Sequence, residues 1–227
     1  MHIAGLQKTS LIDYPEKIAC IIFTQGCNFR CGYCHNPELF EKREPQITQE
    51  AFFDFLKSRQ NKLDGVVITG GEPTLQKDLK DFITTVKEHS FSVKLDTNGT
   101  NPNIIENLLN ENLLDYIAMD IKAPLEKYKS IVNVDINIEN IKKSVELIMN
   151  SNIDYEFRTT VVKSQLNYDD FENIGNLIKK AKKYYLQKFI PSKTLDESLM
   201  KEKTYSNEEF EKVKRILSKY IQKIEIR

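Results

Sequence analysis

The chain has 227 residues, with 33 basic and 33 acidic side chains and therefore no formal net charge. Because 40% of its residues are apolar and 10% are aromatic, it can bury a substantial core, which excludes disordered and low-complexity proteins. A protein that binds nucleic acid by neutralising phosphates carries a basic excess. This chain as a whole has none, so we expect no nucleic-acid partner.

No apolar run is long enough to span a membrane, because the longest, at residues 18–23, has the length of a strand. The N-terminus also lacks the apolar core of a signal peptide, since Asp13 and Glu16 fall where that core would lie. We therefore expect a cytoplasmic protein without membrane contact. In that reducing compartment the four cysteines are better suited to metal binding or reactivity than to structural disulfides.

Apolar runs alternate with amphipathic stretches along the whole chain. The runs predict strands at residues 18–24, 65–69, 92–96, 116–121, 155–162 and 185–190, and a short one at 224–226. The amphipathic stretches predict helices at residues 51–56, with Thr48 as N-cap, and at 75–89, 104–112, 125–132, 138–150, 171–183 and 207–220. No linker or repeat interrupts this alternation of predicted strands and helices. We expect one domain, residues 1–227, with a core at about 16–192 and a C-terminal helix and short strand at 206–227.

Strands that alternate with helices predict parallel βαβ units and an α/β fold. Six units are too few for a closed eightfold barrel and suit either an open doubly wound sheet or a partial barrel. In both architectures ligands bind at the carboxyl ends of the strands. Most of the unusual residues of this chain directly follow a predicted strand, so we expect them to meet at one site.

Three cysteines, Cys27, Cys31 and Cys34, follow the first of these strands with the spacing C-x3-C-x2-C. Such close spacing lets three thiolates converge on one inorganic centre. A structural zinc site would need a fourth protein ligand. His35 directly follows Cys34, so the two side chains would converge poorly on one ion, and Cys20 lies within a strand, where it is most simply a core residue. Three thiolates on a four-iron cluster leave one iron open, which is what catalysis requires.

The second predicted strand ends in Gly70-Gly71-Glu72-Pro73. Glycines let the backbone approach a ligand closely and expose its polar groups, and Pro73 stiffens the exit from the turn. We therefore expect Gly71 to be glycine because its backbone faces a ligand. Taken alone, a turn with two glycines is equally consistent with a plain connection between strand and helix.

The third and fourth predicted strands end in charged residues, Asp96 near Asn98, and Asp120 near Lys122. Such groups are costly to bury without partners, so an ion pair of Lys122 with either aspartate competes with a ligand-binding role. On the fifth strand, Arg158 lies among apolar neighbours. It suits a carboxylate or ribose contact, or a core ion pair with the acidic residues 154 or 156.

The cysteine motif, with Tyr33 just before its third cysteine, resembles the signature of the radical S-adenosylmethionine (SAM) enzymes. In that family the three thiolates hold a [4Fe–4S] cluster, and the methionyl amine and carboxylate of SAM chelate the open iron. The reduced cluster cleaves the cofactor and releases a 5′-deoxyadenosyl radical, which abstracts hydrogen from a substrate. The resemblance implies a partial parallel (βα)6 barrel of the radical SAM type.

The same resemblance implies roles for individual residues. Cys27, Cys31 and Cys34 are the expected metal ligands and catalytic residues. The expected SAM contacts are Tyr33 near the adenine, the turn Gly70, Gly71, Glu72 and Pro73 at the methionyl amine, and Asp96, Asn98, Asp120, Lys122 and Arg158. In glycyl-radical activating enzymes the matching aspartates and lysine contact the methionyl and ribose groups, sometimes through a bound monovalent cation.

Several segments are similar to the anaerobic ribonucleoside-triphosphate reductase activating proteins: residues 9–15, 34–37, 70–76, 94–100 and 119–124. Unlike the related pyruvate formate-lyase activases, the chain has no histidine late in its sequence. The resemblance implies a glycyl-radical enzyme as partner, with anaerobic ribonucleotide reductase the best match, and a flavodoxin or ferredoxin-type reductant. The basic segment at residues 179–193 could steer an acidic partner, although a solvated surface is the default.

Two other functions compete with this one. The first is a radical SAM enzyme that acts on a small molecule such as a deazapurine precursor, similar to 7-carboxy-7-deazaguanine synthase. The second is a metal-binding module without catalysis, against which the whole set of strand-end residues argues. The sequence shows no second substrate domain and no further cysteine cluster, which favours a large protein substrate.

Overall fold

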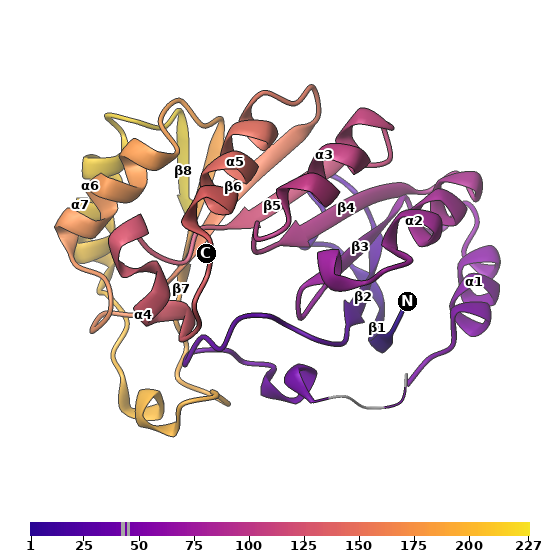
Figure 1. Cartoon of the computed structure of the whole chain (residues 1–227), viewed down its shortest axis with the longest axis horizontal. Helices are drawn as coiled ribbons and strands as arrows, with labels where there is room; N and C mark the ends of the chain where they lie inside the picture. The colour runs from indigo at the N-terminus through magenta and orange to yellow at the C-terminus, as the bar shows by residue number, and fades with distance from the viewer. Residues whose placement is uncertain (42–43, 45) are drawn as a thin grey trace.

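The computed structural model describes residues 1–41, 44 and 46–227. In this part of the chain, eight strands form one sheet whose spatial order follows the sequence order (Figure 1). β1 runs antiparallel to β2, and each later pair of neighbours is parallel. The strands are β1 (Ile3–Ser10), β2 (Ala19–Thr24), β3 (Gly65–Gly70), β4 (Ser92–Thr97), β5 (Tyr116–Asp120), β6 (Asp154–Val161), β7 (Lys183–Lys188) and β8 (Lys223–Ile226).

At least one helix follows each strand from β2 to β7, which gives the six βα units that the sequence predicts. The helices are α1 (Gln49–Ser58), α2 (Leu79–Glu88), α3 (Pro102–Asn110), α4 (Tyr128–Val132), α5 (Ile138–Met149), α6 (Tyr168–Leu177) and α7 (Asn207–Leu217). β1 and β8 form the two edges of the sheet, and within the described residues they do not pair with each other. The fold is therefore the expected partial parallel (βα)6 barrel, extended by one strand at each edge.

Several helix and strand ends shift by a few residues from the predicted bounds, and two differences are larger. β1 is not predicted, because Gly5 and the exposed Gln7 and Lys8 interrupt any apolar run. α6 begins earlier than expected, since Asn167 and Asp170 form a reciprocal capping box at its start. It ends at Leu177 rather than at residue 183. The N-cap of α1 is predicted correctly, as the Thr48 side chain accepts from the Ala51 N–H at 3.2 Å.

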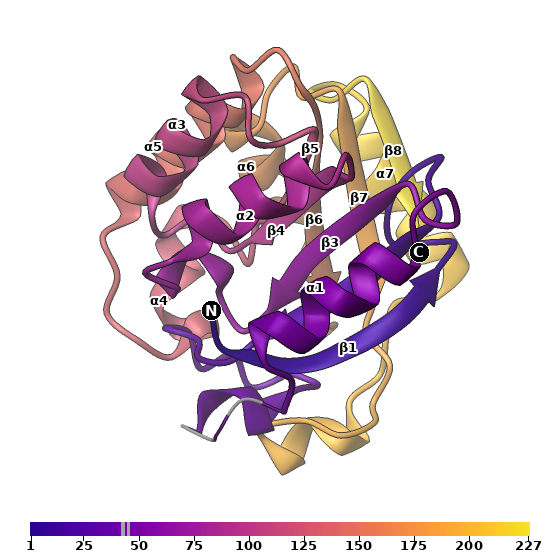
Figure 2. The same cartoon turned by 90° about the vertical axis from the view of Figure 1, so that its right-hand side faces the viewer.

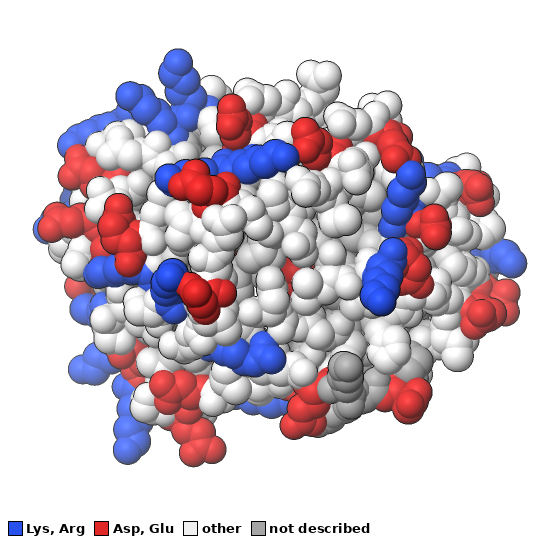
Figure 3. All heavy atoms as spheres, in the orientation of Figure 1, with Lys and Arg blue, Asp and Glu red and all other residues white. Residues whose placement is uncertain are grey.

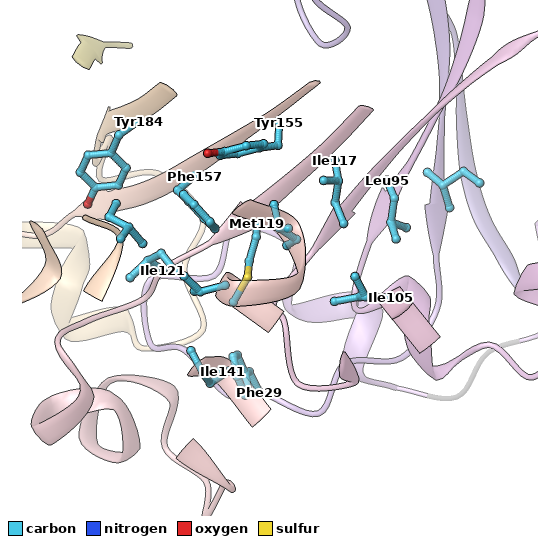
Figure 4. Close-up of a cluster of buried hydrophobic side chains, with 14 of the residues drawn as sticks. Phe29, Leu95, Ile105, Ile117, Met119, Ile121, Ile141, Tyr155, Phe157 and Tyr184 are labelled. Atoms are coloured by element: carbon cyan, nitrogen blue, oxygen red, sulfur yellow. The ribbon is translucent and has the colours of Figure 1, made fainter. Parts of the chain in front are cut away.

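The helices lie on the outer, convex side of the curved sheet (Figures 1 and 2). The main core packs between the helices and this side of the sheet. Side chains alternate along each strand, so Leu95, Met119 and Phe157 all point to this side and are fully buried (Figure 4). Ile105 of α3 and Ile141 of α5 meet them from the helices (Figure 4). Burying an apolar side chain of this size stabilises the fold by about 1.5–3 kcal/mol. Cys20 also belongs to this core, as predicted.

The concave side of the sheet is different in composition. A small apolar cluster that includes Tyr14, Ala19 and Tyr116 closes the end at which the parallel strands begin. Further along the strands, charged side chains replace apolar ones: Lys94 of β4 is 2% exposed and Glu156 of β6 is fully buried. The interior of this barrel is therefore polar over much of its length, unlike a closed eightfold barrel packed with branched apolar residues.

Charged side chains of both signs are interspersed on the molecular face shown in Figure 3. Lysines and arginines gather at the edge where α6 and α7 lie, at the left of Figures 1 and 3, and acidic side chains lie among them. None of the described helices is long and apolar enough to cross a membrane.

Candidate active site

A cavity lies at the carboxyl ends of the strands β2 to β6. The predicted site residues that line it are Cys27, Cys31, Tyr33, Cys34, Gly70, Gly71, Glu72, Asp96, Asn98, Asp120, Lys122 and Arg158. Phe29, Asn36, Leu39, Phe40, Thr69 and Thr97 also line it. Pro73 is not among the residues that line the cavity; it is buried and is the first residue of the short helix η2 (Pro73–Leu75). Residues from five separate parts of the sequence thus meet at one site.

The three thiols belong to the loop between β2 and the short helix η1 (Pro37–Phe40). Burial raises the pKa of each thiol, that of Cys27 to about 11, and the nearby Lys122 opposes the rise. Among the described residues, no three Cys, His, Asp or Glu side chains are arranged to hold a single metal ion. Thiolates that bind a cluster attach to different irons, so they surround a volume rather than one point.

The outer side of the cysteine loop packs against the segment that follows β7. The Asp196 N–H donates to the Gly32 carbonyl at 2.9 Å, and a side chain on Gly32 would press on Asp196 at 3.2 Å. The His35 ring stacks on Phe189 with 5.8 Å between centroids, and its Nδ1 lies 2.9 Å from the Lys193 carbonyl oxygen. His35, considered above as a fourth ligand, is therefore engaged by this outer segment instead.

The two glycines at the end of β3, Gly70 as its last residue and Gly71 just after it, bring the turn against the cysteine loop. Gly70 has φ +116°, and a Cβ on it would lie 2.3 Å from the Thr24 nitrogen. A Cβ on Gly71 would lie 1.9 Å from the Gly26 carbonyl oxygen, which accepts the Glu72 N–H at 2.8 Å. The expectation that Gly71 is required because it faces a ligand was therefore incomplete: its backbone lines the cavity, but contact with the chain itself already demands glycine.

Glu72 joins the turn to the end of β4. Its fully buried carboxylate accepts from Thr74 Oγ1 at 2.5 Å, from Thr97 Oγ1 at 2.8 Å and from the Asn98 N–H at 2.6 Å. Burial raises the pKa of this carboxyl, against the effect of the hydrogen bonds. With these donors around it, Glu72 holds the wall of the cavity in shape.

Asp96, Asp120, Lys122 and Arg158 form one ion-paired group in the cavity wall. Lys122 Nζ lies 2.9 Å from Asp120 Oδ2, and the Arg158 guanidinium contacts both aspartates, at 2.8 and 2.9 Å. Burial works against ionisation of the two carboxyls, but the cations hold the pKa of each below its usual range. The ion pair considered above and the position at the ligand cavity therefore coexist.

The proposed core ion pair of Arg158 with Glu156 or Asp154 is wrong. Glu156 instead accepts from the Tyr116 hydroxyl at 2.9 Å and pairs with Arg227 at 3.3 Å. Side-chain alternation does place Glu156 and Arg158 on the same side of β6, but the arginine extends toward the carboxyl ends, where the aspartates lie.

Besides the six further lining residues, sequence reasoning missed two side chains that contact the cavity wall. Lys94 is buried and pairs with Asp96 at 2.6 Å; its position two residues before Asp96 on one strand was the available signal. Asn28, between the first two cysteines, accepts from the Asn98 side chain at 2.8 Å and donates to Thr100 at 2.9 Å. Because these partners lie about 70 residues apart in sequence, only the fold reveals that contact.

Residues 21–178, more than half of the chain, match the family model of the radical SAM superfamily. The chain belongs to the radical SAM superfamily. It is also 38% identical, over 99% of its length and 95% of the relative, to a Methanocaldococcus jannaschii protein named provisionally as a glycyl-radical enzyme activating enzyme. A pyruvate formate-lyase-activating enzyme of Clostridium pasteurianum is 27% identical over 86% of this chain and 83% of its own length.

Solved structures of other proteins share the fold at low sequence identity. Streptococcus suis SuiB with its precursor peptide SuiA has a TM-score of 0.68 at 14% identity, covering 90% of this chain and 47% of SuiB. Escherichia coli QueE has a TM-score of 0.55 at 18% identity, covering 82% of this chain and 83% of QueE. These likenesses establish the architecture, while the sequence relatives establish the family.

Radical SAM enzymes use a [4Fe–4S] cluster and SAM, and the donor set of the cavity fits both. The three thiols that line the cavity would supply three cluster ligands and leave one iron for the cofactor. The ion-paired wall carries polar and charged groups that match a cofactor with a carboxylate, an ammonium and a ribose. One cavity of this radical SAM enzyme therefore offers donor groups that suit both the cluster and SAM.

Proposed function

We propose that this radical SAM enzyme is a cytoplasmic activase that generates a glycyl radical on a partner enzyme, anaerobic ribonucleoside-triphosphate reductase, with electrons from a flavodoxin or ferredoxin-type protein. The observation that carries the proposal is the near full-length similarity to a protein named as a glycyl-radical enzyme activating enzyme. The motifs shared with the reductase-activating proteins, such as residues 94–100 and 119–124, support the choice of partner.

In this proposal Cys27, Cys31 and Cys34 hold the cluster, which, when bound and reduced, cleaves SAM so that the 5′-deoxyadenosyl group takes a hydrogen atom from a glycine α-carbon. The rest of the cavity binds and orients the cofactor. The proposed contacts are Tyr33, Gly70, Gly71, Glu72, Pro73, Asp96, Asn98, Asp120, Lys122 and Arg158. Glu72 acts as a positioning residue, because its oxygens are engaged by the chain.

The open edge of the barrel supports a polypeptide substrate. A second cavity, lined by Ile12, Asp13, Lys94, Arg158, Gln187 and Arg227, lies on the polar concave side. Arg158 lines both cavities, so the two cavities adjoin at this side chain. Beside it, Leu11 and Ile12 expose 72% and 82% of their surface, which offers apolar contacts to an incoming chain.

The test is hydrogen transfer from partner to cofactor. Anaerobic reductase labelled with α-deuterated glycine is incubated with the reduced, cluster-loaded enzyme and SAM. We expect a glycyl radical in the reductase by electron paramagnetic resonance and deuterium in the 5′-deoxyadenosine. A reductase whose radical glycine is replaced by alanine serves as control and should give neither.

The same assay separates the competing functions. Cofactor cleavage that is stimulated by a deazapurine precursor but leaves the reductase without a radical would establish a small-molecule enzyme instead. A loaded cluster without any 5′-deoxyadenosine would indicate a metal-binding module.

A further inference from the structure

Arg158 occupies the space between the two carboxylates of the cavity wall. Its Nε lies 2.8 Å from Asp120 Oδ1, and its Nη1 lies 2.9 Å from Asp96 Oδ2. The three residues come from neighbouring strands, and Asp120 and Arg158 are direct register partners in the pair β5–β6. A single guanidinium thus bridges the ends of β4 and β5.

The outer oxygens of both aspartates are engaged as well. Lys94 Nζ lies 2.6 Å from Asp96 Oδ1, and Lys122 Nζ lies 2.9 Å from Asp120 Oδ2. Each of the four carboxylate oxygens therefore has a cationic donor. Three cations face two anions, so this group of five residues carries one excess positive charge before any ligand binds.

A bound monovalent cation, which the family resemblance allows, does not fit this arrangement. Hard cations need oxygen ligands with free lone pairs and a negative local field. Here each carboxylate oxygen already accepts from one cationic donor, and the group of five residues is positive overall. Since the side chains of Asp96 and Arg158 are only 12% and 13% exposed, water screens an added charge poorly. A further cation would meet repulsion at this point.

We propose that Arg158 takes the place of a monovalent cation: it holds Asp96 and Asp120 at a fixed separation, so that SAM binds without Na⁺ or K⁺. The geometry makes Arg158 a positioning residue for both aspartates. The guanidinium keeps its proton well above neutral pH, so the bridge does not depend on titration of Arg158. The proposal requires that this cavity binds SAM, and it is independent of the identity of the partner.

The first test is calorimetric titration of SAM into the cluster-loaded protein at one ionic strength, set with NaCl, with KCl or with N-methylglucamine chloride, whose cation is too large for the site. We expect the Kd of the wild-type protein to agree within about twofold among the three salts. A tightening of about tenfold or more in Na⁺ or K⁺ would overturn the proposal.

Two variants make the test specific. Arg158→Met leaves Asp96 and Asp120 facing each other, each with one lysine. This variant should acquire a cation site between the two carboxylates. We therefore expect it to bind SAM about tenfold more tightly in Na⁺ or K⁺ than in N-methylglucamine. Arg158→Lys keeps a positive charge between the carboxylates and should stay insensitive to the salt. An Arg158→Met protein that is equally insensitive would show that the guanidinium substitutes for no cation.

A second readout needs no cofactor. The melting temperature of the metal-free protein is measured in the same three salts, since a cation that binds only the folded state raises it. We expect a higher melting temperature in Na⁺ or K⁺ for Arg158→Met alone. Arg215→Met, which removes an exposed arginine of α7, is the matched control and should behave as wild type. A wild-type melting temperature that depends on Na⁺ or K⁺ would contradict the proposal independently of SAM binding.

Discussion

The two faces of the one sheet differ in what they do, although alternate residues of the same strands supply both. On the convex face, Leu95 and Phe157 are fully buried against helices and contribute only apolar contacts. On the concave face, their sequence neighbours Asp96 and Arg158 are ion-paired beside a cavity. Stability is concentrated on one face and ligand chemistry on the other, so a substitution on either face should affect mainly one of the two properties.

The concave face tolerates buried charge because its charges are paired. An isolated buried carboxylate would cost several kcal/mol, whereas an ion pair with complete hydrogen bonding roughly offsets that cost. A closed barrel would fill the same space with apolar layers. The polar interior therefore has little value for folding, which is consistent with its use for binding.

The largest expected contrast is between the three loop cysteines at the cavity and Cys20 on β2. Replacing Cys27, Cys31 or Cys34 by alanine should abolish the visible absorbance and the iron content of the reconstituted protein, because each supplies one ligand of the cluster. Cys20→Ala, a change in the convex core, should leave iron per protein unchanged. Iron analysis after anaerobic reconstitution checks both, and a loss of iron in Cys20→Ala alone would reverse the assignment.

On the convex face, Phe157→Ala should lower the free energy of unfolding by about 3–5 kcal/mol, since it removes a fully buried ring. The protein that remains folded should bind SAM as wild type does. Urea unfolding of the metal-free protein measures the effect. Ile190→Ala, at a side chain that is 67% exposed, is the control and should change stability by less than about 0.5 kcal/mol. Equal losses in the two variants would contradict the division between the faces.

The convex face is also the part that the sequence predicts best. Apolar runs and amphipathic periods locate β2 to β8, the six helix-containing units and the buried Cys20. They miss β1, because an edge strand that pairs on one side only needs no continuous apolar run. Helix ends such as the start of α6 depend on capping side chains, so the observed ends differ from the predicted ones by several residues.

For the site on the concave face, the sequence predicts which residues take part. It does not predict which of them contact one another. Strand-end motifs identified Cys27, Asp96 and Lys122, since all ends of parallel strands meet at one edge. They could not show that Arg158 bridges two aspartates or that Gly71 touches the cysteine loop. Such contacts join segments far apart in sequence and depend on register, which periodicity does not determine.

A substitution at Gly71 tests whether packing against the chain or contact with a ligand requires glycine at this position. Gly71→Ala places a Cβ 1.9 Å from the Gly26 carbonyl oxygen, so it should lower the free energy of unfolding by about 1–3 kcal/mol and reduce iron loading. Gly5→Ala is a matched control, because its Cβ would lie at an ordinary 3.6 Å from the Phe23 ring. Thermal unfolding and iron analysis measure both. Unchanged stability with weakened SAM binding would show that the ligand alone requires this glycine.

On the concave face, Lys122→Met should weaken SAM binding by about tenfold, or about 1.4 kcal/mol, and change the melting temperature little. Asp120 keeps Arg158 as a partner, so no buried charge is left alone. Lys142→Met, at an exposed lysine of α5 paired with Glu139, is the control for loss of a lysine. A large fall in melting temperature with intact affinity would mean that Lys122 serves the fold.

The smallest expected effect concerns the basic segment at residues 179–193, which the fold divides between the two ends of the barrel. Lys179 and Lys180 precede β7 and lie at its amino end, whereas Lys188 and Lys193 lie at the carboxyl end, on the side of the cavity. Only the second pair can steer a partner toward the site.

If steering operates, radical formation on the partner should slow by about two- to threefold as salt rises, whereas cofactor cleavage without the partner should not, because screening weakens association between separate molecules. Replacing Lys188 and Lys193 by glutamine should remove that salt dependence, and replacing Lys179 and Lys180 should preserve it. Initial rates at several salt concentrations decide the matter. Equal salt dependence of all three proteins would mean that the lysines at the carboxyl end of β7 have no part in docking.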